Sequence, residues 1–173
     1  MQPTSPRPIS IIGDVHGHLK KLVKLLQDAQ LIDTEHSWKG CDDYLFMHAD
    51  APFYIKCGHT VDEVNAAFNK LLRWSDALAW EEMLEDFARR GAFMHTNNGV
   101  EFARRFLSLF GGRQLVHGHT PISSILRCPP RQVDGPWIYA GGQCINVDGG
   151  MFLGGPGFVH QLPADRESNI PPK

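Results

Sequence analysis

Residues 9–18, with the sequence ISIIGDVHGH, decide how the fold is expected to begin. The β-rich run at residues 9–12 predicts a short strand, and the glycines at positions 13 and 17 bound a turn. Apolar residues then recur at helical spacing, with lysines on the opposite face: Leu19, Leu22, Val23 and Leu26 against Lys20, Lys21 and Lys24. A strand, a glycine loop and a helix in this order predict an α/β fold. Its ligand site is expected where the strand ends.

Further elements follow from local signals along the chain. Residues 44–48 predict a second buried strand, and Thr60 with Glu63 forms a capping box that opens a helix. The inward face of this helix is expected to hold Val61, Val64, Phe68, Leu71 and Leu72. A second helix is expected to carry Trp80, Met83, Leu84 and Phe87, and a third to carry Val100, Ala103, Phe106, Leu107 and Phe110 before Gly111 and Gly112 end it.

The second half of the chain has a different sequence pattern. Short apolar runs separated by glycines lie at residues 122–126, 137–140, 144–147 and 158–162. This pattern predicts an antiparallel meander. We expect a flexible lead at residues 1–8, one domain at 9–163 and a polar tail at 164–173.

The composition is that of an ordinary globular protein. The chain has 173 residues, of which 42% are hydrophobic, and its 17 basic and 19 acidic residues give a net charge of -2. This balance offers no basic field for nucleic acid, and no apolar stretch is long enough to cross a membrane. Four cysteines without a C-x-x-C pair, and the lack of a recognisable signal peptide, predict reduced thiols and a cytoplasmic location. The sequence leaves the oligomeric state open.

Three clusters of potential metal ligands follow predicted strands. They are Asp14 with His16, His48, and His117 with His119. Mixed carboxylate and imidazole ligands favour manganese, iron or zinc over calcium. Each cluster also has an ordinary interpretation, because a D-x-H sequence can be a capped turn and His48 can be a hydrogen-bonded core histidine. His117 and His119 alternate across a strand end, so at most one of them is expected to face the site.

These motifs, taken in order, resemble the calcineurin-like metallophosphoesterases, and their serine/threonine protein phosphatase branch in particular. Residues 13–17 (GDVHG) resemble the first motif of that family, and residues 46–50 (FMHAD) resemble a later strand with a ligand histidine. Residues 118–121 (GHTP) match a further ligand motif, and residues 145–150 (INVDGG) are similar to the strand that follows it.

The resemblance implies a four-layer α/β/β/α sandwich with two divalent ions (Mn, Fe or Zn) at the sheet edge. The implied reaction is hydrolysis of phosphate monoesters by a metal-bridged hydroxide, with a phosphorylated protein or small molecule as substrate. Asp14 and His16 would hold the first ion, and His48 and His119 the second. His18 and His117 match no ligand position, so they are assigned supporting or surface roles, with the surface favoured for His18.

Two family motifs are missing from the sequence. GDxxDRG, which supplies a bridging aspartate and a phosphate-binding arginine, does not occur, and neither does GNHE or GNHD, which supplies an asparagine ligand and an acid histidine. The simplest explanation is an internal deletion near residues 40–43, which predicts a sandwich that lacks one or two βα units. The catalytic residues therefore stay unknown. Arg73 is a candidate phosphate ligand, although an arginine on a helix surface is the ordinary interpretation.

The leading hypothesis is a metal-dependent phosphoesterase. The alternative is a catalytically impaired or inactive remnant that binds metal or phosphate through the retained scaffold. A fragment without a stable native state is the third possibility.

Overall fold

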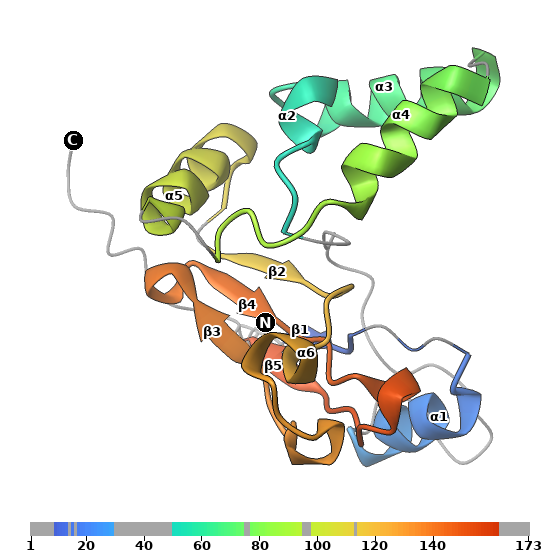
Figure 1. The fold of residues 1–173 in the computed structure, drawn as a ribbon, viewed down its shortest axis with the longest axis vertical. Helices are drawn as coiled ribbons and strands as arrows, with labels where there is room; N and C mark the ends of the chain where they lie inside the picture. The colour runs from blue at the N-terminus through green and yellow to red at the C-terminus, as the bar shows by residue number, and fades with distance from the viewer. Residues whose placement is uncertain are drawn as a thin grey trace, which may run out of the picture.

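The computed structural model describes residues 9–13, 15, 17–29, 50–74, 77–94, 98–112 and 114–162. These residues form a mixed α/β structure with small sheets and helices (Figure 1). This confirms the α/β class. The expected strand at residues 44–48, the junction near residues 40–43, the lead at 1–8 and the tail at 164–173 lie outside the described residues.

The first half of the described chain is mostly helical. Strand β1 (Ile9–Ile11) precedes helix α1 (Leu19–Asp28), as the opening sequence predicts. Four helices follow after residue 50: α2 (Tyr54–Cys57), α3 (Val61–Trp74), α4 (Ala77–Ala88) and α5 (Gly99–Phe110). The second half contains β2 (Leu115–His117), α6 (Ile122–Leu126), η1 (Pro130–Gln132), β3 (Trp137–Tyr139), η2 (Ala140–Gly142), β4 (Cys144–Asn146), η3 (Met151–Leu153) and β5 (His160–Leu162).

Two small sheets bring distant parts of the sequence together. Strands β1 and β5 pair antiparallel, with Ile9 opposite Leu162, so the beginning and end of the described chain share a sheet. The other sheet has the order β2-β4-β3, in which β2 and β4 are parallel and β3 and β4 are antiparallel. Because parallel strands end at the same edge, the residues that follow β2 and β4 are neighbours.

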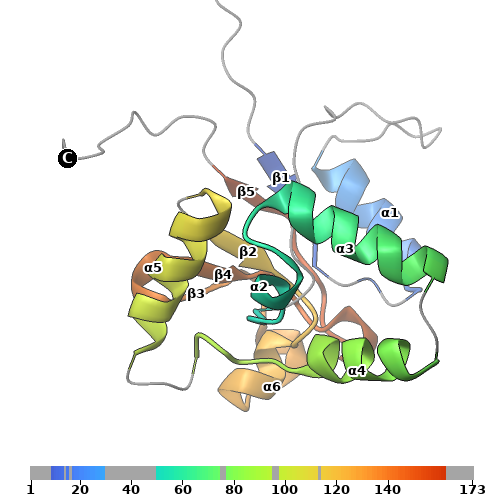
Figure 2. The same ribbon diagram turned by 90° about the horizontal axis from the view of Figure 1, so that it is seen from above.

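Alternate residues of β2 and β4 face two different cores. Val116 and Ile145 join an apolar cluster with Ile11 of β1 and with Phe158. Their chain neighbours Leu115 and Cys144 face the opposite way, into a cluster with three side chains of α5: Ala103, Phe106 and Leu107. Strand side chains alternate between faces, so this sheet is covered on both sides. Figures 1 and 2 show α5 lying over β2 and β4.

Helices α2, α3 and α4 form a helical lobe on one side of the strands (Figures 1 and 2). Its small apolar centre contains Ala51, Phe53, Phe68 and Phe87. The predicted capping box is confirmed at the start of α3. The Glu63 backbone N–H donates to Thr60 Oγ1 at 3.2 Å, and the His59 N–H donates to the Glu63 carboxylate at 2.7 Å.

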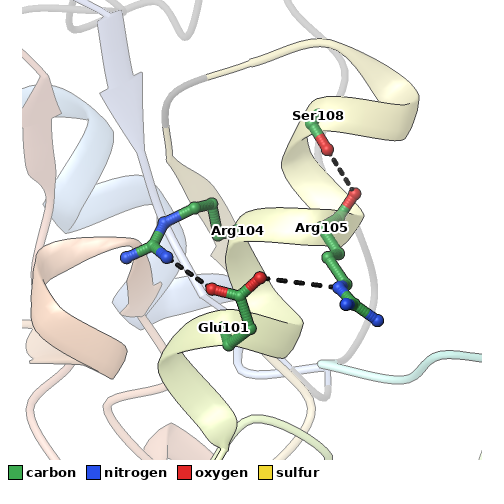
Figure 3. A network of polar contacts seen from close by, with 4 residues as sticks. All are labelled: Glu101, Arg104, Arg105 and Ser108. Atoms are coloured by element: carbon green, nitrogen blue, oxygen red, sulfur yellow. Dashed lines mark hydrogen bonds and ion pairs between the residues drawn. The ribbon is translucent and has the colours of Figure 1, made fainter.

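The solvent-facing side of α5 carries a charged network (Figure 3). Glu101 pairs with Arg104 one turn later and with Arg105, whose Nε lies 3.5 Å from the second carboxylate oxygen. The Ser108 hydroxyl donates to the Arg105 carbonyl at 2.9 Å. This side is polar, while the opposite side packs on the sheet, as the helical periodicity predicts.

Two predictions about the second half are wrong. Residues 122–126 are helix α6 and not a strand, because Pro121 stands at the helix start and the Ser124 and Ile125 N–H groups both donate to its carbonyl. A short apolar run does not by itself distinguish a buried strand from a buried helical turn. The sheet is also no simple antiparallel meander, since the chain crosses from β2 through α6 and β3 before β4 pairs parallel to β2.

Some predicted inward and outward positions are also wrong. Leu19 and Leu72 are 66% and 65% exposed, because they lie beyond the strip of each helix that meets the rest of the protein. Lys21 of α1 is partly buried instead, and its ammonium donates to the carbonyls of Met151 at 3.0 Å and Gly155 at 2.7 Å. In the described part of the chain, no helix has the length and apolar character needed to cross a membrane.

Candidate functional site

Gly13 lies directly against the end of strand β4. A Cβ atom added at this position would stand 2.1 Å from the Val147 carbonyl oxygen and 2.8 Å from the Asp148 Cα. Only glycine permits this approach of two backbones. Gly13, where the glycine loop begins, is therefore placed at the carboxyl end of β4.

The segment after β2 is hydrogen-bonded to the same edge. The Val147 N–H donates to the His117 carbonyl at 2.9 Å, and the Ile122 N–H donates to the Asp148 carbonyl at 3.0 Å. Residues 118–121 thus form a turn held at both ends by the chain that follows β4. Three sequence motifs, beginning at residues 13, 118 and 145, meet at one edge of the sheet.

Buried polar side chains at the end of β4 and just after it stabilise the turn at residues 118–121. The Asn146 amide donates to the Thr120 carbonyl at 2.8 Å, and its oxygen accepts the Asp148 N–H at 2.8 Å. Asp148 in turn accepts the Gly150 N–H at 2.9 Å. Asn146 and Asp148 are both fully buried. The residues of the 145–150 motif therefore shape the edge through their hydrogen bonds.

His119 occupies the middle of the turn with an unusual backbone. Its φ of 66° lies in the left-handed region, which non-glycine residues rarely adopt. Such a conformation persists only where surrounding contacts enforce it, and residues of this kind cluster at functional sites. The His119 ring lies 6.3 Å, between ring centroids, from the ring of Phe87 on α4. The helical lobe therefore reaches the candidate site.

A buried chain of hydrogen bonds runs beside the site. His117 is 1% exposed; its Nδ1 lies 3.0 Å from the Gly118 carbonyl and its Nε2 lies 2.8 Å from the Tyr139 hydroxyl. The Tyr139 hydroxyl donates to Asp50 Oδ2 at 3.1 Å, and Asp50 is fully buried. Sequence reasoning missed Asp50 and Tyr139. The only signal for Asp50 was an acidic residue two positions after His48.

Burial also shifts the acidity of two groups in this region. Burial, and secondarily the Asp50 carboxyl, raises the pKa of Tyr139 above its ordinary value. Burial raises the pKa of the Cys144 thiol to about 12. Both groups therefore keep their hydrogens at neutral pH.

Cys57, Cys128 and Cys144 are free thiols.

The structure places the predicted site residues unequally. His119 is at the strand edge, and His117 is buried beside it, so His117 is not a surface residue. Arg73 is exposed in the last turn of α3, and His18 precedes α1 at the start of that helix. The other three predicted ligands, Asp14, His16 and His48, lie outside the described residues.

Within the described ranges, no group of three or more His, Cys, Asp or Glu side chains is arranged to hold a metal ion. A pocket of about 290 Å³ lies in the helical lobe and not at the strand edge. Its walls include Phe53, Phe68 and Met83, with Lys56 and Asp86 forming an ion pair at 2.5 Å.

Comparisons with known proteins add no neighbour to this picture. No family model, no curated protein and no solved structure matches the chain. The candidate site therefore rests on its residues and on their arrangement at the sheet edge.

Proposed function

We propose that the chain is a metal-dependent phosphoesterase that hydrolyses phosphate monoesters at the common edge of β2 and β4. The observation that carries the proposal is the close approach of Gly13 to Val147 and Asp148, at the edge to which the His119 turn is hydrogen-bonded. Open α/β sheets bind their ligands at such an edge. The fold we propose is the incomplete four-layer sandwich that the motifs imply.

The residues that we propose for this edge are of the types that bind a divalent metal ion. His119 offers an imidazole within an enforced turn, and Asp14 and His16 follow Gly13 in the sequence. With His48, these residues make a mixed carboxylate and imidazole set that suits manganese, iron or zinc. Asp14 and His16 would hold one ion, and His48 and His119 a second. When bound, such an ion acts as a Lewis acid that stabilises charge on the phosphoryl group.

Residues around His119 hold its turn in place. Asn146 holds the turn through the Thr120 carbonyl, and His117 holds it through the Gly118 carbonyl. Phe87 places an apolar ring next to His119, at 6.3 Å between ring centroids. The substrate class we propose is a phosphorylated protein or small molecule. The free thiols of Cys57, Cys128 and Cys144 support a cytoplasmic location.

The absent GDxxDRG and GNHE motifs favour a second candidate function. Without the bridging aspartate and the acid histidine, the same edge can bind metal or phosphate and have no turnover. The loss of groups that only support metal ligands typically costs about 10–100-fold in affinity or activity, and the loss of ligands should cost more. Turnover separates this remnant from an active enzyme.

The test combines Mn²⁺ titration with hydrolysis of p-nitrophenyl phosphate by the full chain. We expect Mn²⁺ binding and Mn²⁺-dependent turnover, both reduced by at least about 10-fold in His119→Ala, because an imidazole ligand is lost. Asp14→Ala and His48→Ala should behave in the same way. The matched control is His59→Ala, since His59 is exposed between α2 and α3 of the helical lobe.

Each outcome has a distinct meaning. Mn²⁺ binding without turnover identifies the non-catalytic remnant. Turnover that survives His119→Ala, Asp14→Ala and His48→Ala means that the site is wrongly assigned. A wild-type chain that binds no Mn²⁺ contradicts both candidate functions. The absence of a cooperative melting transition by circular dichroism would identify a fragment without a stable fold.

A further inference from the structure

Asp50 closes the base of the helical lobe. Its Oδ1 accepts the Gly91 N–H at 2.9 Å, and its carbonyl accepts the Ala92 N–H at 3.3 Å. The chain enters the lobe just after Asp50 and leaves it just before Gly91, so one buried residue holds both ends together. Figure 1 shows these two connections side by side between the lobe and the strands.

The second carboxylate oxygen of Asp50 is used differently. Asp50 Oδ2 accepts the Tyr139 hydroxyl hydrogen at 3.1 Å, and the same hydroxyl lies 2.8 Å from His117 Nε2. The Tyr139 ring is held in place by Trp137, which stacks on it at 4.4 Å between centroids and 11° between planes. A single hydroxyl on β3 thus connects the base of the lobe to the end of β2.

The connected residues stand next to two predicted ligands in the sequence. Asp50 follows His48 by two positions, and His117 precedes His119 by two. We propose that Tyr139 is a positioning residue, whose hydroxyl couples the segment after His48 to the turn that carries His119.

The coupling is a geometric inference, while its effect on metal binding rests on the proposed function. A buried carboxylate and a buried imidazole each lose a partner when the hydroxyl is removed, and buried polar groups without partners are costly. Both segments are then expected to shift or to open more often. Because Tyr139 has a raised pKa, the hydroxyl keeps the hydrogen that it donates to Asp50.

The test uses Tyr139→Phe in the full chain, which removes only the hydroxyl. We expect Mn²⁺ affinity to fall by about 10- to 100-fold, as for other groups that support metal ligands. In the metal-free protein, amide hydrogen exchange should become faster at both ends of the coupling. The amides to follow are those of Gly91 and Ala92, bonded to Asp50, and of Thr120, bonded to the Gly118 carbonyl.

Two controls separate positioning from general destabilisation. Ser108→Ala also removes one hydroxyl that donates a hydrogen bond, but on the outer side of α5 (Figure 3), and should change neither readout. Val133→Ala truncates a buried side chain of the apolar core. It should lower Tm without the paired increase in exchange at Gly91 and Thr120, and without a comparable loss of Mn²⁺ affinity.

The results decide the two proposals separately. Unchanged exchange at either Gly91 or Thr120 in Tyr139→Phe overturns the coupling, as does an equal loss of Mn²⁺ affinity in Val133→Ala at a matched loss of Tm. If the wild-type chain binds no Mn²⁺, the proposed function fails, and exchange at the two ends alone decides the coupling. Should Tyr139→Phe fail to fold, Asp50→Asn keeps the volume and removes the carboxylate. Because Asp50 itself accepts the Gly91 N–H, this variant is judged only at Thr120, where unchanged exchange overturns the coupling.

Discussion

At the scale of single residues, glycine 13 has the strictest requirement that we find at the candidate site. Glycine is required there because no space is left for a Cβ atom, and not because of its φ angle. The backbone that follows β4 occupies the position that a side chain would take. Gly17 differs, because its φ of 76° is a left-handed conformation that favours glycine. Glycine is therefore favoured at positions 13 and 17 of the same loop for different physical reasons.

Gly13→Ala is expected to destabilise the protein by about 3 kcal/mol or more, because its methyl group would overlap the Val147 carbonyl. Gly135→Ala is the control, since a Cβ there meets nothing within 4 Å and should change stability by less than about 0.5 kcal/mol. Urea unfolding followed by circular dichroism measures both. Equal stability of the two variants would mean that Gly13 does not touch β4.

At the scale of elements, α1 is fastened by a lysine that helical patterning would leave in solvent. The Lys21 ammonium binds two carbonyls in the loop at residues 151–155, whereas Lys24, one turn along, forms an exposed ion pair with Asp28. Hydrogen bonds to a charged group contribute more than surface ion pairs do. Helix α1 is therefore linked to the glycine-rich loop after β4 by its polar side.

Lys21→Met is expected to lower the free energy of unfolding by about 2 kcal/mol, through the loss of two charge-assisted hydrogen bonds. Lys24→Met, its matched control on the same helix, should cost less than about 1 kcal/mol. Chemical denaturation of both variants gives the comparison. A Lys24 variant as unstable as the Lys21 variant would show that charge, and not the contact with the loop, matters.

Helix ends could be predicted from the sequence where a capping box or a glycine marks them. The capping box at Thr60 and Glu63 locates the start of α3, and Gly111 ends α5 where the periodicity stops. Helix α6 could not be identified, because five apolar and small residues fit a strand equally well. The parallel pairing of β2 and β4 depends on contacts between residues far apart in the sequence, which no local pattern reveals.

The candidate site shows the same division. The predictions for His119 and for the loop at Gly13 depend on short motifs that are contiguous in sequence. Asp50 and Tyr139 could not be identified, since the hydrogen bond between them joins positions 89 residues apart. An aspartate in a turn and a tyrosine in a strand have no distinguishing sequence pattern. Their role depends on burial, which only the folded arrangement provides.

At the scale of the whole molecule, β5 contributes a dependence of stability on pH. Burial lowers the pKa of His160 below its ordinary value of 6.5, so the folded state favours the neutral ring. The unfolded chain binds a proton as the pH falls through about 6.5, before the folded protein does. The stability that His160 contributes is therefore present above that pH and is lost as the pH falls toward the folded pKa.

His160→Gln should consequently lose less stability than the wild type when the pH falls from about 7.5 to about 5.5. Melting temperatures of both proteins across this range provide the measurement, and the comparison cancels the titration of the other histidines. A steeper loss in His160→Gln than in the wild type would contradict the lowered pKa. The effect concerns the pairing of β1 with β5, in which His160 is opposite Ile11.

The meeting of Asp50 with Gly91 and Ala92 has an evolutionary consequence. A segment whose two ends are joined at one point can be lengthened, shortened or exchanged with little disturbance to the strands from which it emerges. Mutations in α2, α3 and α4 can accordingly alter the surface beside His119 while β2, β4 and the turn between them stay in place. The molecule thus separates a lobe whose surface can change from a strand edge whose backbone contacts hold the His119 turn.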